Sequence, residues 1–289
     1  MAPLVRLTDL DHARGEVVEI WNRAQPQEPL SPSEVGRILA ADPGLVLVTP
    51  DPSGVLAATL RSSTSGRRGH VRLIAVDDAR RRQGVASQLL DAAIDWMVRQ
   101  GATSLRWGAE APWYLWPGID AAWDAALALA AHRGARQTGE AVNLCLTTDF
   151  HIEPPAGVTI ERLTSAAHHA DMVAAARELV GRNWPPWLVE FDLAVESGTL
   201  FVAFAGSEPL AFMAHSTLRH GWLGPMGTDP EHQSRGVGAA TMSAACADLA
   251  QRGVDTAQIA WVGPVSYFTR LGARPCRTFR QMAQELPQA

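Results

Sequence analysis

Lysine is missing from this chain of 289 residues, and all 25 of its basic residues are arginine. Without a lysine amine, the protein cannot form a pyridoxal Schiff base, act as a lysine aldolase or build a Walker-type phosphate loop. Arginine can bind phosphate, but its guanidinium stays protonated and does not act as a nucleophile near neutral pH. Phosphate binding by arginine or by backbone groups therefore remains open.

Cysteine is also scarce, because Cys145, Cys246 and Cys276 are far apart and form no Cys-x-x-Cys pair. This spacing argues against a disulfide framework and against a zinc site. We therefore expect all three to be small, buried, apolar residues. The adjacent His168 and His169 diverge on a helix, and no other ligand pair has suitable spacing, so we expect no metal.

An excess of positive charge is absent too, since the formal net charge is -5. Nucleic acid is thus disfavoured as a main partner. No apolar run approaches the length that crosses a bilayer, and the N-terminus shows no charged leader with an apolar core. We expect a cytoplasmic protein that does not bind membranes, and the length suits two ordinary domains.

Two similar segments, Arg81–Ala86 and Gln233–Gly238, each join a strand-like run to an Ala-rich, helix-like run. The strand-like runs are residues 71–76 and 222–228. A loop of small residues can turn several backbone N–H groups toward an anion, and the positive end of the following helix adds its field. One copy would equally well be an ordinary glycine-containing loop. Two copies in matching surroundings favour a phosphate-binding loop made twice.

The order of predicted elements repeats along the chain. Residues 5–8 correspond to residues 161–164, and each segment precedes a helix-like stretch. A strand hairpin follows in both halves, and then the strand, loop and helix described above, a short strand, a helix and a last strand. Residues 150–157 contain two prolines and a glycine, which favour an extended connector. We therefore expect two domains, residues 1–149 and 157–289.

This strand, the Gln/Arg-x-x-Gly-x-Gly/Ala loop and the helix resemble the GNAT superfamily of acyl-CoA-dependent N-acyltransferases, once per half. Residues 224–230, 261–265 and 116–118 further resemble a group of bacterial tandem GNAT proteins. The resemblance implies an α/β (α+β) fold with two domains in tandem, each a mixed, partly split β-sheet flanked by helices. It also implies acetyl-CoA or another acyl-CoA as donor, with the pantetheine arm in the split and the pyrophosphate on the loop.

Carried onto this sequence, the resemblance assigns acyl-CoA binding to the same elements in both halves. Each set contains strand residues beside the pantetheine and loop residues whose N–H groups hold the pyrophosphate. In the C-terminal half the set is Met226, Gly227, Thr228, Gln233, Ser234, Arg235, Gly236, Val237, Gly238 and Ala239. In the N-terminal half it is Ile74, Ala75, Val76, Arg81, Arg82, Gln83, Gly84, Val85, Ala86 and Ser87.

The family often places a tyrosine four residues before the glycine of the last helix, as the acid for the departing thiolate. That position is Ala130 in the first half and Phe268 in the second, with Tyr267 one step earlier. One residue is about 100° of rotation on a helix, so Tyr267 reaches the sulfur only if the helix starts late or is shifted. Its alternative role is that of a packing aromatic residue. For the oxyanion, the resemblance indicates a backbone N–H near Gly227.

The preferred candidate for the general base is His215, at the end of a predicted strand near the split. The further candidates are Asp229, Glu196 and His232. Trp184, Trp187 and Glu190 could receive an amine cation through aromatic and carboxylate contacts. The alternative is a proline-stiffened loop whose tryptophans pack on the other domain.

The C-terminal half has the fuller loop motif and a tyrosine near the acid position, so we expect it to be the catalytic one. The N-terminal half would be a structural partner or a relic that still binds acyl-CoA. We expect transfer of an acetyl group from acetyl-CoA to a primary amine of a small molecule, by direct attack on the thioester. The alternatives are a catalytically silent acyl-CoA sensor or scaffold and a dinucleotide-binding oxidoreductase, although Gly236–Thr241 lacks the third glycine of the latter. The protein would be a monomer with an internal pseudo-dimer, or a homodimer.

Overall fold

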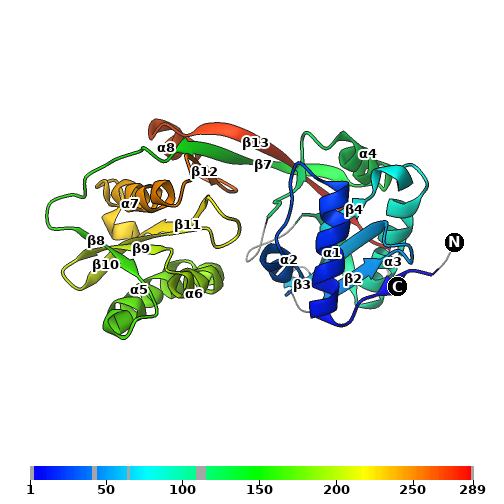
Figure 1. Cartoon of the computed structure of the whole chain (residues 1–289), viewed down its shortest axis with the longest axis horizontal. Helices are drawn as coiled ribbons and strands as arrows, with labels where there is room; N and C mark the ends of the chain where they lie inside the picture. The colour runs from blue at the N-terminus through cyan, green and yellow to red at the C-terminus, as the bar shows by residue number, and fades with distance from the viewer. Residues whose placement is uncertain (1–2, 41–43, 64–65, 109–114, 288–289) are drawn as a thin grey trace. The chain divides into compact units, whose positions relative to one another are not determined.

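The computed structural model describes residues 3–40, 44–63, 66–108 and 115–287 and divides the chain into two compact units (Figure 1). Unit 1 comprises residues 1–141 and 279–289, and unit 2 comprises residues 142–278. No helix in the described part of the chain is long and apolar enough to cross a membrane.

Unit 1 is a mixed sheet with helices on both faces. Its sheet order is β1-β2-β3-β4-β5, followed by the last part of β13, with β6 paired to β13. The elements are β1 (Val5–Arg6), α1 (Leu10–Ala24), α2 (Pro32–Leu39), β2 (Gly44–Val48), β3 (Gly54–Ser63), β4 (Gly66–Val76), α3 (Val85–Arg99), β5 (Ala102–Trp107), β6 (Ile119–Asp120) and α4 (Asp124–His132).

Alternation along the strands decides which helix each side chain of unit 1 meets. Leu56 of β3 packs with Leu89 and Met97 of α3 in one core cluster, and all three are fully buried. Two helices of the unit, α1 and α2, begin at side-chain caps. Ser31, for example, forms a capping box with Glu34 at the start of α2.

Unit 2 repeats this plan. Its sheet order from β7 is β7-β12-β11-β10-β9-β8. The elements are β7 (Arg136–Thr147), β8 (Thr159–Leu163), α5 (Ala170–Asn183), α6 (Leu188–Ser197), β9 (Leu200–Ala205), β10 (Glu208–His215), β11 (Trp222–Thr228), α7 (Val237–Gln251), β12 (Thr256–Ile259), α8 (Val265–Arg270) and β13 (Arg274–Glu285).

The two faces of the unit 2 sheet carry different helices (Figure 1). Phe201 of β9 and Met213 of β10 pack in the hydrophobic cluster of α7. Their sequence neighbours Val202 and Phe212 pack in the cluster of α5 and α6, on the other face. This alternation confirms the mixed, helix-flanked sheet predicted for each half. The connector, residues 150–157, runs without regular structure, as its prolines predicted, and its Ile152 N–H donates to Ser243 Oγ of α7 at 3.0 Å.

The compact units do not coincide with the predicted ranges 1–149 and 157–289. β7 begins in unit 1 and ends in unit 2, and β13 begins in unit 2 and ends in unit 1. Each half therefore contributes its last strand to the sheet of the other unit, as when Met282 of β13 pairs with Trp107 of β5. Hydrophobic patterning cannot show this exchange, because it predicts a strand but not the sheet that the strand joins.

The prediction for two of the three cysteines was wrong. Cys145 of β7 and Cys276 of β13 form a disulfide inside unit 2, with their Cα atoms 5.8 Å apart. They are 131 residues apart in sequence, and only the strand arrangement brings them together. Cys246 is fully buried in α7, as predicted, and burial raises the pKa of its thiol to about 12.

Candidate active site

The two predicted phosphate loops follow the same backbone path. Arg82 and Gly84 have φ values of 62° and 83°, and Ser234 and Gly236 have φ values of 63° and 81°. A positive φ is uncommon outside glycine. The same pair of left-handed residues at matching positions therefore shows that the two loops share one backbone conformation. Both glycines are exposed, which leaves the concave backbone of each loop open to an anion.

Each loop leads directly into a helix whose first turn is open. Gly84 and Gly236 are the N-cap residues of α3 and α7, no side chain caps either helix, and neither has an acidic residue in its first turn. Among the described residues, the first N–H groups of these helices thus have no competing carboxylate or cap. The positive ends of both helix dipoles favour an anion at the loops.

Beside each loop, the sheet has an open edge. β11 pairs with β12 only at Trp222 and Leu223, and then bulges at Gly224 and Pro225 opposite β10. β4 likewise pairs with β5 only as far as Val71. Within the described residues, the last five positions of β11 and of β4 therefore have no strand partner on that side. The predicted split is present in both units.

The N–H groups that face the open edge follow from the register. Asp229 N donates to Leu210 O at 2.8 Å, which makes this a hydrogen-bonded pair of β11 and β10. Directions alternate along a strand, so the N–H of Gly227 also points to β10, and those of Met226 and Thr228 point to the open edge. The N–H of Gly227, which the resemblance indicated for the oxyanion, therefore points away from the split. The backbone donors that face the split are those of Met226 and Thr228.

Gly238, in the first turn of α7, marks where three side chains from two further elements meet. A Cβ atom placed on it would lie 2.5 Å from Thr228 Oγ1, 3.0 Å from Met226 Cε and 3.4 Å from Tyr267 Oη. The α7 helix approaches β11 this closely because Gly238 has no side chain. The hydroxyls of Thr228 and Tyr267 and the thioether of Met226 therefore line one face of the open edge.

Tyr267, rather than Phe268, reaches this cluster. α8 comprises the six residues Val265–Arg270 and begins directly after Pro264. Phe268 is buried in the hydrophobic cluster of unit 2. Burial raises the pKa of Tyr267, which keeps its hydroxyl protonated at neutral pH.

The opposite face of β11 is covered by aromatic rings. Atoms of the Trp184 indole would lie 2.6 Å from a Cβ on Gly227, so the ring rests on the backbone of the strand. Trp184 stacks with Trp187 at 5.9 Å between centroids and also contacts Phe212 at 5.7 Å. Glu190, in the first turn of α6, is fully buried. The two tryptophans thus pack within unit 2.

His215 lies in the core rather than on the open edge. It is fully buried, its Nε2 lies 2.9 Å from Asp248 Oδ2, and its Nδ1 lies 3.1 Å from Ser216 Oγ. Burial lowers its pKa to about 4, although Asp248 opposes the shift. Arg162 and Arg252 also bind Asp248, at 3.2 and 2.6 Å. These contacts favour a structural role for His215 over that of a general base.

The other three candidates for the general base lie in the loop or at the end of α6. Asp229 begins the phosphate loop, with Oδ1 bound to Glu231 N–H and Oδ2 bound to Arg182. His232 lies in the turn within the loop, and Glu196 is exposed at the end of α6. In the part of the chain that the structure describes, no group of three or more metal-binding side chains occurs.

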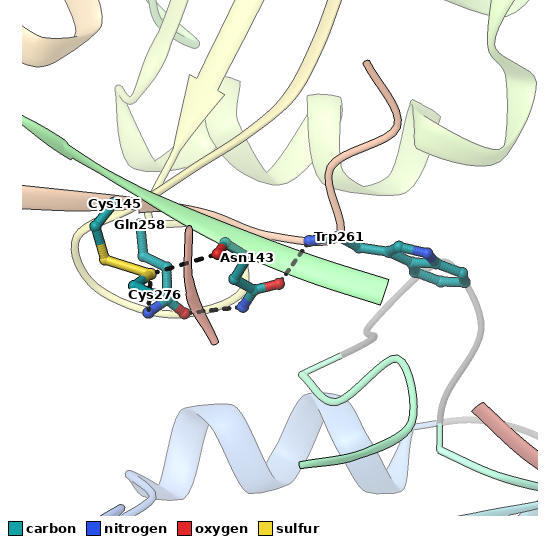
Figure 2. The surroundings of a disulfide bond; sticks show 5 residues. All are labelled: Asn143, Cys145, Gln258, Trp261 and Cys276. Atoms are coloured by element: carbon teal, nitrogen blue, oxygen red, sulfur yellow. Dashed lines mark hydrogen bonds between the residues drawn. A yellow bond between two sulfur atoms is a disulfide. The ribbon is translucent and has the colours of Figure 1, made fainter. Parts of the chain in front are cut away.

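The far side of the split in unit 2 is held by a buried asparagine. Figure 2 shows the Asn143 amide between Gln258 and the backbone of Trp261, next to the disulfide. Asn143 Nδ2 donates to Gln258 Oε1 at 2.9 Å, and Asn143 Oδ1 accepts from Trp261 N–H at 2.8 Å. The turn that follows β12 is therefore attached to β7, beside Cys145.

Unit 1 has the same loop and open edge, but different side chains. Ala86 stands at the position of Gly238, and Ala130 stands where the family acid is expected. Arg72, the bulged residue of β4, is buried, and burial lowers its pKa to about 10. The Arg81 guanidinium is bound by the backbone of unit 1, because it donates to the carbonyl oxygens of Val76 and Ala24 at 3.0 and 2.8 Å.

Both units thus contain a split, mixed sheet and an exposed loop before a helix without a side-chain cap. A family model for the acetyltransferase (GNAT) family matches residues 14–112 and 164–268, more than half of the chain. The chain therefore belongs to the acetyltransferase (GNAT) family, in the tandem arrangement. No curated protein sequence matches it.

Solved structures agree on the fold. A tandem GNAT protein from the clavulanic acid biosynthesis pathway is 17% identical, with a TM-score of 0.73, over 99% of both chains. A GCN5-related N-acetyltransferase from Sphaerobacter thermophilus is 16% identical, with a TM-score of 0.67, over 100% of this chain and 98% of the other. A glucosamine N-acetyltransferase region of a fungal GH3 β-N-acetylglucosaminidase is 21% identical, with a TM-score of 0.70; 98% of this chain spans 38% of that longer protein.

Proposed function

We propose that this protein is an acyl-CoA-dependent N-acyltransferase that moves an acetyl group from acetyl-CoA to a primary amine of a small molecule. The observation that carries the proposal is the convergence, in unit 2, of an exposed backbone nest, an unpaired strand edge and a protonated tyrosine. The nest suits a diphosphate, the edge suits an amide-containing arm, and the tyrosine is a proton donor.

The residues fit acyl-CoA on two observations. Ser234 and Gly236 hold the left-handed conformations that open the nest, and Gly238 lets α7 approach the edge of β11. Residues 233–239 would hold the diphosphate, and Met226 and Thr228 would pair with the pantetheine. Bound there, the group supplies an acyl thioester, which a neutral amine attacks directly.

The residues of the chain then contribute positioning and charge stabilisation. The N–H of Met226, beside the bulge, would donate to the oxyanion that develops during the attack. Tyr267 would protonate the departing thiolate. Trp184 and Trp187 would form one wall for the amine on the opposite face of β11. Glu190 is fully buried, so it would not contact the amine. The amine would attack in its neutral form and would give up its proton to water as the C–N bond forms and the C–S bond breaks. Much of the rate enhancement would come from this positioning.

Unit 1 would bind acyl-CoA without transferring its acyl group. Its loop matches that of unit 2, but Ala130 offers no acid. This contrast supports a silent acyl-CoA-binding role for unit 1, as a sensor or scaffold. The proposal includes a cytoplasmic location and a monomer with an internal pseudo-dimer, or a homodimer. The Cys145–Cys276 disulfide argues against this location, because disulfides are rare in reducing compartments such as the cytoplasm.

The test is release of free CoA from acetyl-CoA in the presence of a panel of primary amines, with separation of the acylated products. The proposal expects amine-dependent CoA release that Tyr267→Phe lowers. CoA binding without release for any amine would instead favour the silent acyl-CoA-binding alternative for both units.

A further inference from the structure

An ion pair ties the helix on the acceptor face of each unit to the start of its phosphate loop. In unit 2, Arg182 Nη2 lies 3.1 Å from Asp229 Oδ2. In unit 1, Arg23 donates through Nε and Nη2 to Asp77 Oδ2, at 3.2 Å each. Asp77 and Asp229 both stand seven positions before the N-cap glycine of the following helix.

The helix ends match as closely as the loops do. Arg23 and Arg182 each stand two residues before a C-cap whose φ and ψ are -135° and 63° at Gln25 and -143° and 58° at Trp184. Each C-cap N–H donates to the carbonyl four residues back, at 2.7 Å. The arginines of the two pairs are 62% and 50% exposed and the aspartates 14% and 22%, and ion pairs open to solvent on one side contribute little to stability. The same contact at the same positions in two diverged halves therefore indicates a role besides stability.

The ion pair connects the two binding faces of β11. Asp229 follows Thr228 directly, and its Oδ1 caps the turn that begins the loop through Glu231 N–H. Two residues after Arg182, the indole of Trp184 rests on Gly227. The end of α5 thus touches the same short segment of chain twice, through Arg182 beside the loop and through Trp184 on the acceptor face.

We propose that Arg182 is a positioning residue that couples occupation of the phosphate loop to the placement of Trp184 on the acceptor face. A diphosphate that orders residues 229–236 would fix Asp229, and through Arg182 it would fix the end of α5. The inference rests on the proposed function, because it takes the diphosphate to be that of an acyl-CoA.

The two units differ in how freely this coupling can act. In unit 1, Arg81 of the loop also binds Ala24 O, the last carbonyl of α1, and Arg23 binds Pro52 O at 2.5 Å. In unit 2, Gln233 stands at the position of Arg81, and its Nε2 donates to Thr228 O at 3.4 Å. The Arg182 side chain is 62% exposed. We therefore expect the ligand to change the end of α5 more than the end of α1.

Hydrogen–deuterium exchange of the full chain, with and without CoA, tests the coupling. In the wild type, CoA should slow exchange in peptides that cover 229–239 and, by about fivefold, in those that cover 180–190. Arg182→Ala should keep the protection of 229–239 and lose that of 180–190, and Arg182→Lys should retain part of it. Arg177→Ala is the matched control, because Arg177 lies on α5, the helix of Arg182, but pairs with Asp192 of α6, at 2.8 Å.

The outcomes separate this inference from the proposed function. If CoA protects no peptide in the wild type and gives no heat of binding, the proposed function fails. If CoA protects 229–239 but leaves 180–190 unchanged, or if Arg177→Ala uncouples as strongly as Arg182→Ala, only the positioning role fails. Should Arg182→Ala not fold, Arg182→Gln keeps the length of a polar side chain and answers the same question.

Discussion

Replacement of Gly238 by alanine tests the close approach of α7 to the open edge of β11. The added Cβ would lie 2.5 Å from Thr228 Oγ1 and 3.0 Å from Met226 Cε. The methionine tip can move, but the threonine oxygen sits on a branched Cβ with few rotamers. Overpacking of this kind costs about 1–3 kcal/mol. Alanine gains about 0.5–1 kcal/mol over glycine in a helix, so the net loss should be about 0–2.5 kcal/mol.

Denaturant unfolding measures this loss, and calorimetry with CoA measures the consequence for binding, which should weaken as α7 moves away from β11. Gly15→Ala is the matched control, because nothing lies within 4 Å of a Cβ at that position of α1. It should stabilise the protein by about 0.5–1 kcal/mol. Thr228→Ala should rescue Gly238→Ala. The reasoning would be refuted if Gly238→Ala stabilised the protein as Gly15→Ala does.

Three further predictions concern single side chains. The pKa of histidine in the unfolded chain is about 6.5, and burial lowers the pKa of His215 to about 4, so the unfolded state takes up the proton first as pH falls. Stability is full above pH 6.5, and about 3 kcal/mol should be lost by pH 4, a loss that pH-dependent unfolding of His215→Gln should lack. Tyr267→Phe should lower kcat by about a hundredfold and leave the calorimetric affinity for CoA unchanged; an unchanged kcat would exclude the acid role. Thiol titration of the denatured chain should find one thiol before reduction and three after it, and Cys276→Ser should cost about 2–4 kcal/mol of unfolding free energy; three thiols without reductant would contradict the Cys145–Cys276 bond.

The loops and the order of elements could be predicted because their signals are local. Periodicity placed the helices after Gly84 and Gly236 to within two residues, and the duplicated glycine pattern predicted both nests. The role of Tyr267 depended on where α8 begins. Proline at 264 sets that start, at a position where sequence rules are accurate only to a few residues.

What could not be predicted depends on contacts between distant strands. Cys145 and Cys276 meet only because β13 and β7 adjoin, and His215 is buried only because α7 brings Asp248 to it. The Arg182–Asp229 pair was missed, although its signal was present. An alignment of the two halves places an arginine near the end of the first helix, and an aspartate directly after the strand, in both.

The most direct test of the central claim is calorimetric titration of CoA into the wild type, Gly236→Val and Gly84→Val. At φ values of 81° and 83°, a β-branched residue cannot keep the loop conformation, and no neighbouring atom lies closer than 3.8 Å to either added Cβ. The account predicts clear binding heat in the wild type and the loss of one site in each variant. No heat with the wild type, or unchanged heat in Gly236→Val, would contradict it.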